Sequence, residues 1–205
     1  AAQTISEIII NVYKSLNHVM DAYIFSIGIY DDKNNIIDYK SYIGNRDILI
    51  EQNIDIDNNE SFSSWVIKNR EDLIILDNSN EGERKKYVKK HGIGSYSEKG
   101  EFIDSMVILL LEFKGNIIGT MAVRSREKYA YDKRQLEILK ILKSFIAIAL
   151  NNAKDREKLH QENETRRKVQ KELELANQKL YNLSITDALT MLKNRHYLYN
   201  ELDNI

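Results

Sequence analysis

The 205-residue sequence contains no cysteine and no proline, and its eight glycines all lie at or before Gly119. Without cysteine, these residues hold no disulfide, no thiolate metal ligand and no thiol-linked chromophore, as is usual in a reducing compartment, and we expect a cytoplasmic location. Residues 120–205 therefore lack both strong helix breakers. The chain divides into a glycine-punctuated first part and a second part that favours uninterrupted helix.

The charge and the hydropathy of the sequence argue against nucleic-acid-binding and membrane-spanning proteins. The formal net charge is −1, so we expect no nucleic acid and no anionic membrane surface as a partner. No apolar run reaches the roughly 18 residues of a membrane span, and the first residues show no signal-peptide pattern. We expect no membrane segment within these residues, and any anchor would lie upstream. A hydrophobic content of 42% suits one domain of about 150 residues with an appendage.

The first part alternates between helical and strand periodicity. A helical apolar pattern over 5–19 precedes two strand-like segments, 23–30 and 36–43, around the polar turn 31–35. A short helix at 62–66 and a short strand at 73–76 follow. A second pair of strands is predicted at 106–111 and 117–123, around Lys114, Gly115 and Asn116. The pattern predicts an α+β fold.

This order, with a late hairpin at 113–119 and a terminal helix at 132–153, resembles the GAF family over roughly residues 3–153. PAS domains are the nearest alternative. The resemblance implies an antiparallel sheet with flanking helices and a sensory or dimerisation role. It also implies that Trp65, Tyr87 and Tyr96 lie in segments covering the ligand side of the sheet. They are our candidate contacts for an unknown small molecule, with core packing the alternative for Trp65.

Residues 131–183 predict one helix, about 75 to 80 Å long at 1.5 Å per residue. Two apolar stripes have the spacing of a helix–helix seam; they are Leu139, Leu142, Ile146, Ala149 and Ala153, then Val169, Leu173, Ala176, Leu180 and Leu183. Traced back toward the N-terminus, the second stripe places Asp155, Glu162 and Arg166 at core positions. Counted forward from Ala153, the spacing of the first stripe misses Leu159 by one residue. We expect a parallel two-stranded coil, weak in its middle; a solvated single helix is the alternative.

The last segment carries a distinctive motif. The motif residues are Asp187, Leu189, Thr190, Leu192, Asn194 and Arg195. They resemble the opening signature of the GGDEF family, the diguanylate cyclases, although Met191 stands where the family usually has glycine. An ordinary helix start is the alternative. The resemblance implies a parent protein that condenses two GTP to cyclic di-GMP with Mg²⁺, and whose catalytic domains act as pairs.

The active site of such a parent would lie beyond this sequence. Only ten residues follow Arg195, and no two glycines are adjacent, so we nominate no catalytic residue and no cofactor here. The four histidines are scattered and predict no metal site. We expect a GAF-like sensory domain at 1–153, a coiled-coil signalling helix at 154–183 and a truncated GGDEF start at 184–205. The alternatives are a ligand-free dimerisation scaffold, or the sensor of a degenerate GGDEF or phosphodiesterase hybrid.

Overall fold

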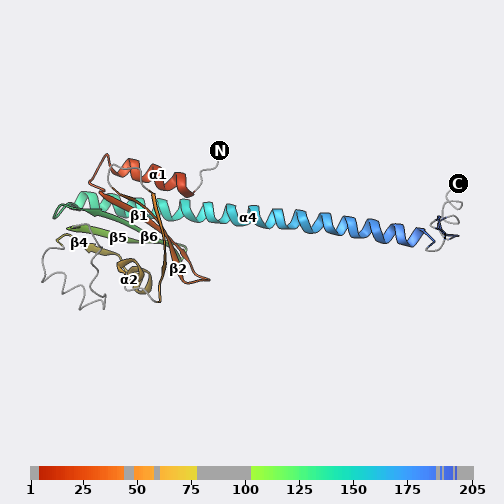
Figure 1. Cartoon of the computed structure of the whole chain (residues 1–205). Helices are drawn as coiled ribbons and strands as arrows, with labels where there is room; N and C mark the ends of the chain where they lie inside the picture. Colours follow the sequence, from red (N-terminus) through yellow and green to blue (C-terminus); the bar gives the residue numbers. More distant parts are fainter. Residues whose placement is uncertain are drawn as a thin grey trace. The chain divides into compact units, whose positions relative to one another are not determined.

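The structure of the chain is a computed structural model, and it describes residues 5–43, 49–57, 61–77, 103–187, 190, 192–195 and 197. The chain forms two compact units, Ala1–Lys154 and Asp155–Ile205. The first contains a sheet with helices on both of its faces (Figure 1). The second contains the later part of a long helix and the turn that follows it.

The sheet has six antiparallel strands in the order β3-β2-β1-β6-β5-β4. The strands are β1 (Ile24–Asp31), β2 (Ile36–Ile43), β3 (Leu49–Asp55), β4 (Leu73–Ile75), β5 (Ser105–Phe113) and β6 (Asn116–Ser125). The two central strands, β1 and β6, come from distant parts of the sequence. The four predicted strands of the two hairpins are confirmed; β3, a polar strand at the sheet edge, was not predicted because its sequence lacks a clear alternation.

Three helices complete the described fold: α1 (Ile5–Leu16), α2 (Phe62–Asn69) and α4 (Lys133–Ile185). Helix α2 begins at Ser61, whose hydroxyl accepts a 3.1 Å hydrogen bond from the Ser64 amide. Helix α4 begins with a reciprocal pair: Asp132 Oδ1 accepts from the Gln135 amide at 2.8 Å, and Gln135 Oε1 accepts from the Asp132 amide at 2.9 Å. Such a capping box satisfies two otherwise unpaired backbone donors.

Each face of the sheet carries its own hydrophobic core. Helix α1 and the first turns of α4 cover one face, where Ile9, Phe25, Leu109 and Ile146 are buried together. Helix α2 lies on the opposite side of the sheet in Figure 1, where Trp65, Val66 and other residues form the second core. The predicted α+β class, an antiparallel sheet with flanking helices that continues into a long C-terminal helix, is confirmed.

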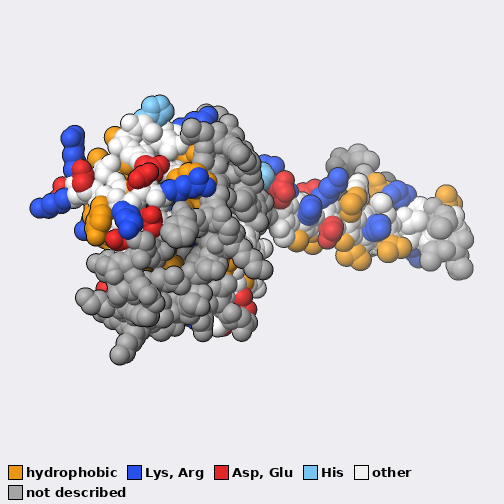
Figure 2. Space-filling model, turned by 60° about the vertical axis from the view of Figure 1, so that its left-hand side comes forward, with side chains coloured by type: hydrophobic (Ala, Val, Ile, Leu, Met, Phe, Trp, Pro, Cys, Tyr) orange, Lys and Arg blue, Asp and Glu red, His pale blue; other side chains and the backbone are white. Residues whose placement is uncertain are grey.

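Helix α4 is 53 residues long and starts two residues later than the sequence predicts. In the first unit one side of it is buried against the sheet, through residues that include Leu139, Leu150 and Ala153. From Asp155 onward nearly all its side chains are exposed. Hydrophobic side chains alternate there with charged ones (Figure 2). Among the helices of the described residues, none is long and apolar enough to span a bilayer.

Candidate ligand-binding face and the turn after α4

The face of the sheet under α2 has a floor of small residues at its centre. On β1, Ser26 and Gly28 occupy alternate positions and therefore point to the same face as buried Ile24. Across the ladder to β6, Ser26 pairs with Ala122 and Gly28 with Thr120. Four small residues on two adjacent central strands leave space above the sheet that larger neighbours must fill.

Tyr39 fills part of that space. A Cβ atom built on Gly28 would lie 2.9 Å from two ring carbons of Tyr39 and 2.5 Å from Cγ2 of Ile37. The tyrosine ring therefore crosses the backbone of β1 at Gly28. Its hydroxyl reaches Oγ1 of Thr120 on β6, 3.1 Å away, although the two residues are 81 positions apart in the sequence. Glycine is required at residue 28 because any side chain there would displace the ring.

Burial raises the pKa of the Tyr39 phenol, while hydrogen bonds with Ser63 and Thr120 and the charge of Arg124 act in the opposite direction. The phenol is therefore protonated at neutral pH and both donates and accepts hydrogen bonds. Ser63 belongs to α2, so the phenol links the helix to the floor of the sheet. The described residues on this side of the sheet offer neutral hydroxyls in an apolar setting, with the charge of Arg124 nearby.

Ser26 adds a polar group of a different kind. Only 1% of its surface is exposed, and among the described residues its hydroxyl has no hydrogen-bond partner. An unsatisfied buried hydroxyl costs about 1 to 3 kcal/mol. A small molecule that bonded to Ser26 would remove that cost.

The predicted contact residues are placed only in part. Trp65 lies on α2 over this face, but it exposes only 8% of its surface and is part of the second core. Its position agrees with core packing. Tyr87 and Tyr96 lie outside the described residues, so their role stays a prediction. Tyr39, Thr120 and Ser26 were missed, although Ser26 and Gly28 at alternate positions of a buried strand are a sequence signal for a small-residue floor.

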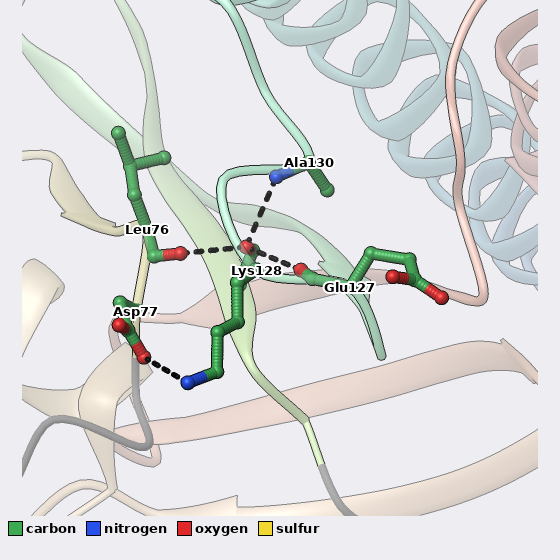
Figure 3. Close-up of polar contacts among 6 residues, drawn as sticks. Leu76, Asp77, Glu127, Lys128 and Ala130 are labelled. Carbon is green, nitrogen blue, oxygen red and sulfur yellow. Dashed lines mark hydrogen bonds and ion pairs between the residues drawn. The ribbon is translucent and has the colours of Figure 1, made fainter.

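The Ser105 hydroxyl joins the labelled residues Leu76, Glu127 and Ala130 of Figure 3, which belong to two segments of the chain. Its hydroxyl lies 2.9 Å from the Leu76 carbonyl oxygen and 2.6 Å from that of Glu127, and it accepts a 3.2 Å hydrogen bond from the Ala130 amide. Lys128 and Asp77 form an ion pair at 3.6 Å beside it. The end of β4 is therefore attached to the connection that leads into α4.

In the second unit, the motif residues build a tight turn after α4. Asp187 Oδ1 accepts hydrogen bonds from the amide and the hydroxyl of Thr190, each 2.9 Å long. The Asp187 amide donates to the Leu192 carbonyl at 2.8 Å, and Thr186 pairs with Lys193 in an antiparallel bridge. These bonds explain why aspartate and threonine are needed three residues apart.

Asn194 closes the same turn from the other side. Its side-chain amide donates to the Ser184 carbonyl at 2.5 Å, its backbone amide donates to Ile185 at 2.8 Å, and its Oδ1 accepts from the Tyr197 amide at 2.9 Å. Asn194 thereby joins the last turn of α4 to the residues that follow. Leu192 is exposed, Arg195 is helical and Leu189 lies outside the described residues.

Metal ligation finds no support in this geometry. Over the part of the chain that the structure describes, no three His, Asp or Glu side chains converge on one point. His18 lies on an exposed surface, with Nδ1 2.5 Å from the Lys14 carbonyl oxygen. His160 pairs with Glu164 on α4 at 3.6 Å. The described residues therefore offer hydrogen-bonding hydroxyls rather than metal ligands.

A family model described as "GAF domain" matches residues 2–151. The chain belongs to the GAF family. Its six-stranded sheet, with α1 and α4 on one face and α2 on the other, is the fold of that class. None of the curated proteins compared with the chain matches it.

Solved structures share this fold at low sequence identity. The GAF domain of a phosphoenolpyruvate-protein phosphotransferase from Coxiella burnetii is 12% identical, with 76% of this chain and 88% of that chain covered and a TM-score of 0.57. The GAF domain of a two-component sensor histidine kinase from Bacillus halodurans is 14% identical, with 75% and 97% covered and a TM-score of 0.55.

An enzyme shares the same fold. Free methionine-R-sulfoxide reductase from Neisseria meningitidis, solved with its substrate, is 9% identical, with 76% of this chain and 83% of that chain covered and a TM-score of 0.55. At these identities the likeness shows the fold alone. Chemistry through a cysteine thiol is excluded within these 205 residues because they contain no cysteine.

Proposed function

We propose that this GAF domain senses a small polar molecule on the face of the sheet under α2. The observation that carries the proposal is the buried hydroxyl of Ser26, for which the described residues provide no hydrogen-bond partner, next to the small-residue floor and the Tyr39–Thr120 pair. The neutral hydroxyls favour a ligand that exchanges hydrogen bonds in an apolar setting.

We further propose that the output of the parent protein is a diguanylate cyclase. The support is the motif turn after α4, in which Asp187, Thr190 and Asn194 each use a side-chain group that the signature specifies. The parent would join two GTP into cyclic di-GMP, with Mg²⁺ and release of pyrophosphate. Residues 1–205 would regulate that reaction and would not catalyse it.

Ligand binding is tested by a thermal-shift screen of metabolites on the purified chain. A ligand at one hundred times its dissociation constant, bound to the native state alone, adds about 2.7 kcal/mol of stability. Ser26→Ala should leave the unliganded protein equally or more stable, because it removes an unsatisfied hydroxyl. The same variant should weaken the ligand by roughly tenfold, the loss of about one hydrogen bond.

Ser15→Ala is the matched control. The Ser15 hydroxyl is exposed and bonds to the Asn11 carbonyl within α1. Its removal should therefore change neither the stability of the unliganded protein nor its affinity for the ligand. If Ser26→Ala stabilises the protein but no metabolite shifts its melting temperature, the sensor proposal fails. The scaffold alternative would then hold, with the Tyr39 ring over Gly28 as part of a filled face.

The output is tested separately. Purified chain incubated with GTP and Mg²⁺ should make no cyclic di-GMP, whereas the full-length parent should make it. Product from the chain alone would contradict the placement of the active site downstream. A parent that binds GTP without forming product would support the degenerate-GGDEF alternative.

A further inference from the structure

Helix α4 carries a second apolar stripe, on a different side from the one that packs on the sheet. Ile141, Phe145 and Ile148 expose 60%, 65% and 39% of their surfaces, while Leu139 and Ile146 on the same turns are buried. Large apolar side chains at exposed positions are ordinary when scattered. These three recur at steps of four and three residues, which places them in one line along the helix.

The second unit continues with the same spacing. Leu159, Val169, Leu173, Leu180 and Leu183 are each more than half exposed. Counting from Phe145, Leu159 lies fourteen residues on and Leu173 another fourteen, which is two heptads each time. The exposed residues of both units therefore belong to one heptad frame.

The complete frame alternates steps of three and four residues without a break. Its positions are Ile138, Ile141, Phe145, Ile148, Asn152, Asp155, Leu159, Glu162, Arg166, Val169, Leu173, Ala176, Leu180 and Leu183. The break expected from the sequence depends on counting from Ala153, and Ala153 is buried in the first unit. The exposed stripe avoids that residue.

We propose that this frame, named here the α4 seam, is the surface on which a second copy of the chain pairs in parallel and in register. Heptads sustained over this length are typical of coiled coils. With Ile138 as position a, Asn152 also falls at a. In a parallel pair Asn152 faces Asn152 of the copy, where the two amides exchange hydrogen bonds; an antiparallel pair would place it opposite a d residue.

The flanking charges agree with self-pairing. In a parallel coil each g residue faces the e residue five positions on in the copy. The pairs are Ser144 with Ala149, Asn151 with Arg156, Lys158 with Asn163, Thr165 with Gln170, Glu172 with Asn177 and Lys179 with Ser184. None of them opposes two like charges. Asp155, Glu162 and Arg166 each face the same residue of the copy, which weakens these layers, while Glu162 and Arg166 in successive layers offset part of that repulsion with opposite charges.

The polar layers are concentrated in one place. Of the five layers from Asn152 to Arg166, four are polar and only Leu159 is apolar. Apolar layers flank them on both sides, at 138–148 and at 169–183. The seam therefore begins within the GAF domain itself, and its weakest part lies just beyond that domain.

This inference deepens the proposed function but does not require a ligand. The first experiment compares Leu173→Lys with Leu175→Lys by light scattering of the full chain. Both leucines are exposed to a similar degree, 58% and 52%, on the same helix, but Leu175 lies off the seam at position c. We expect a dimer whose dissociation constant rises at least about tenfold for Leu173→Lys and stays within about twofold for Leu175→Lys.

The second experiment tests direction and register by cross-linking. Because the chain has no cysteine, one introduced thiol is the only one present. Phe145→Cys and Leu173→Cys should each oxidise to a covalent dimer, since equivalent a positions lie within disulfide reach in a parallel pair. Leu175→Cys should stay monomeric under denaturing conditions. An antiparallel pair would leave both a-position variants uncrosslinked.

A monomeric wild-type chain, equal responses to the two lysine variants, or cross-linking at residue 175 in place of 173 would overturn the inference. The ligand proposal is judged by different data. A saturable thermal shift in a monomeric chain would overturn the seam alone, and a dimer without any thermal shift would overturn the sensor alone.

Discussion

The amide of Ala130 donates a 3.2 Å hydrogen bond to the hydroxyl of Ser105, which joins the connection before α4 to strand β5. The same hydroxyl reaches the carbonyl of Leu76 at the end of β4. Residues 78–102, which include the predicted contacts Tyr87 and Tyr96, begin two positions after Leu76 in the sequence. The Ser105 side chain thus links the connection before α4 with the end of β4, and the segment predicted to cover the ligand side follows β4 in the sequence.

Ser105→Ala should therefore destabilise the fold by about 1 to 3 kcal/mol, because it removes a buried hydroxyl that contacts the backbone of Leu76, Glu127 and Ala130. Urea unfolding followed by circular dichroism measures the change. Ser15→Ala, an exposed position on α1, should cost no more than about 0.5 kcal/mol. Equal effects would mean that the Ser105 bonds are replaced by water.

Gly28→Ala should also destabilise the first unit, by about 1 to 3 kcal/mol, since the new methyl group would overlap Ile37 and the Tyr39 ring. Tyr39→Ala removes one of the two obstacles. In that background the same glycine substitution should cost less, and a double-mutant cycle measures the difference. Strict additivity would show that the ring does not lie over Gly28.

Alkaline pH should weaken the fold through buried tyrosines. Burial and the charge of Asp21 raise the pKa of Tyr131 above its ordinary value of 10.0, and burial raises the pKa of Tyr39 as well. The folded state then keeps protons that the unfolded state releases, so the stabilisation is complete below pH 10 and falls as pH rises above it. Each such tyrosine should contribute a loss of about 1.4 kcal/mol per pH unit.

Unfolding free energies measured at several pH values around and above 10 test this expectation. Tyr131→Phe should reduce the slope, although it also loses the 3.1 Å hydrogen bond to the Asp21 carbonyl and is less stable at neutral pH. Tyr129→Phe, at an exposed position, should leave the slope unchanged. An unchanged slope in Tyr131→Phe would show that this phenol ionises freely in the folded protein.

Insertions after Lys158 should show whether the strength of the dimer depends on the length of α4 or on the angular position of its residues. One residue rotates everything beyond it by about 100° and moves Leu173 off the α4 seam. Seven residues add a complete heptad and keep the frame. We expect the single insertion to weaken the dimer about tenfold or more and the seven-residue insertion to leave it nearly unchanged. Equal dissociation constants by light scattering would argue against a register-dependent seam.

Asp187→Ala should loosen the turn after α4, because Thr190 loses both of its hydrogen bonds to the carboxylate. A loss of about 1 kcal/mol of local stability is typical of such caps. Amide exchange of Thr190 is the sensitive measurement, and it should speed up in the variant. Exchange that is unchanged would mean that this carboxylate does not hold the turn.

Much of the fold could be predicted because it is written in local periodicity. The strands β1, β2, β5 and β6 have apolar runs or alternation bounded by turn residues, and α4 has no breaker over its whole length. The edge strand β3 has the weakest pattern, since no described strand pairs with its outer side and polar residues are favoured at sheet edges.

The candidate site could not be predicted in the same way. Tyr39 meets Thr120 only because β1 pairs with both β2 and β6, and that pairing is set by contacts far apart in the sequence. The second half of the proposed α4 seam, from Val169 to Leu183, follows the stripe predicted from the sequence, but its first half differs from the predicted one for another reason. The helix has apolar residues at seam spacing on two sides, and only burial of Leu139 and Ile146 shows which side the sheet already occupies.

Between Ile138 and Ala153, one side of helix α4 therefore packs in the core of its own subunit, and another side forms part of the proposed seam. Folding and association then share one set of backbone turns and are thermodynamically linked. The melting temperature should rise with protein concentration. A molecule that tightens the sheet against α4 should strengthen the dimer by the same factor by which dimerisation strengthens its own binding.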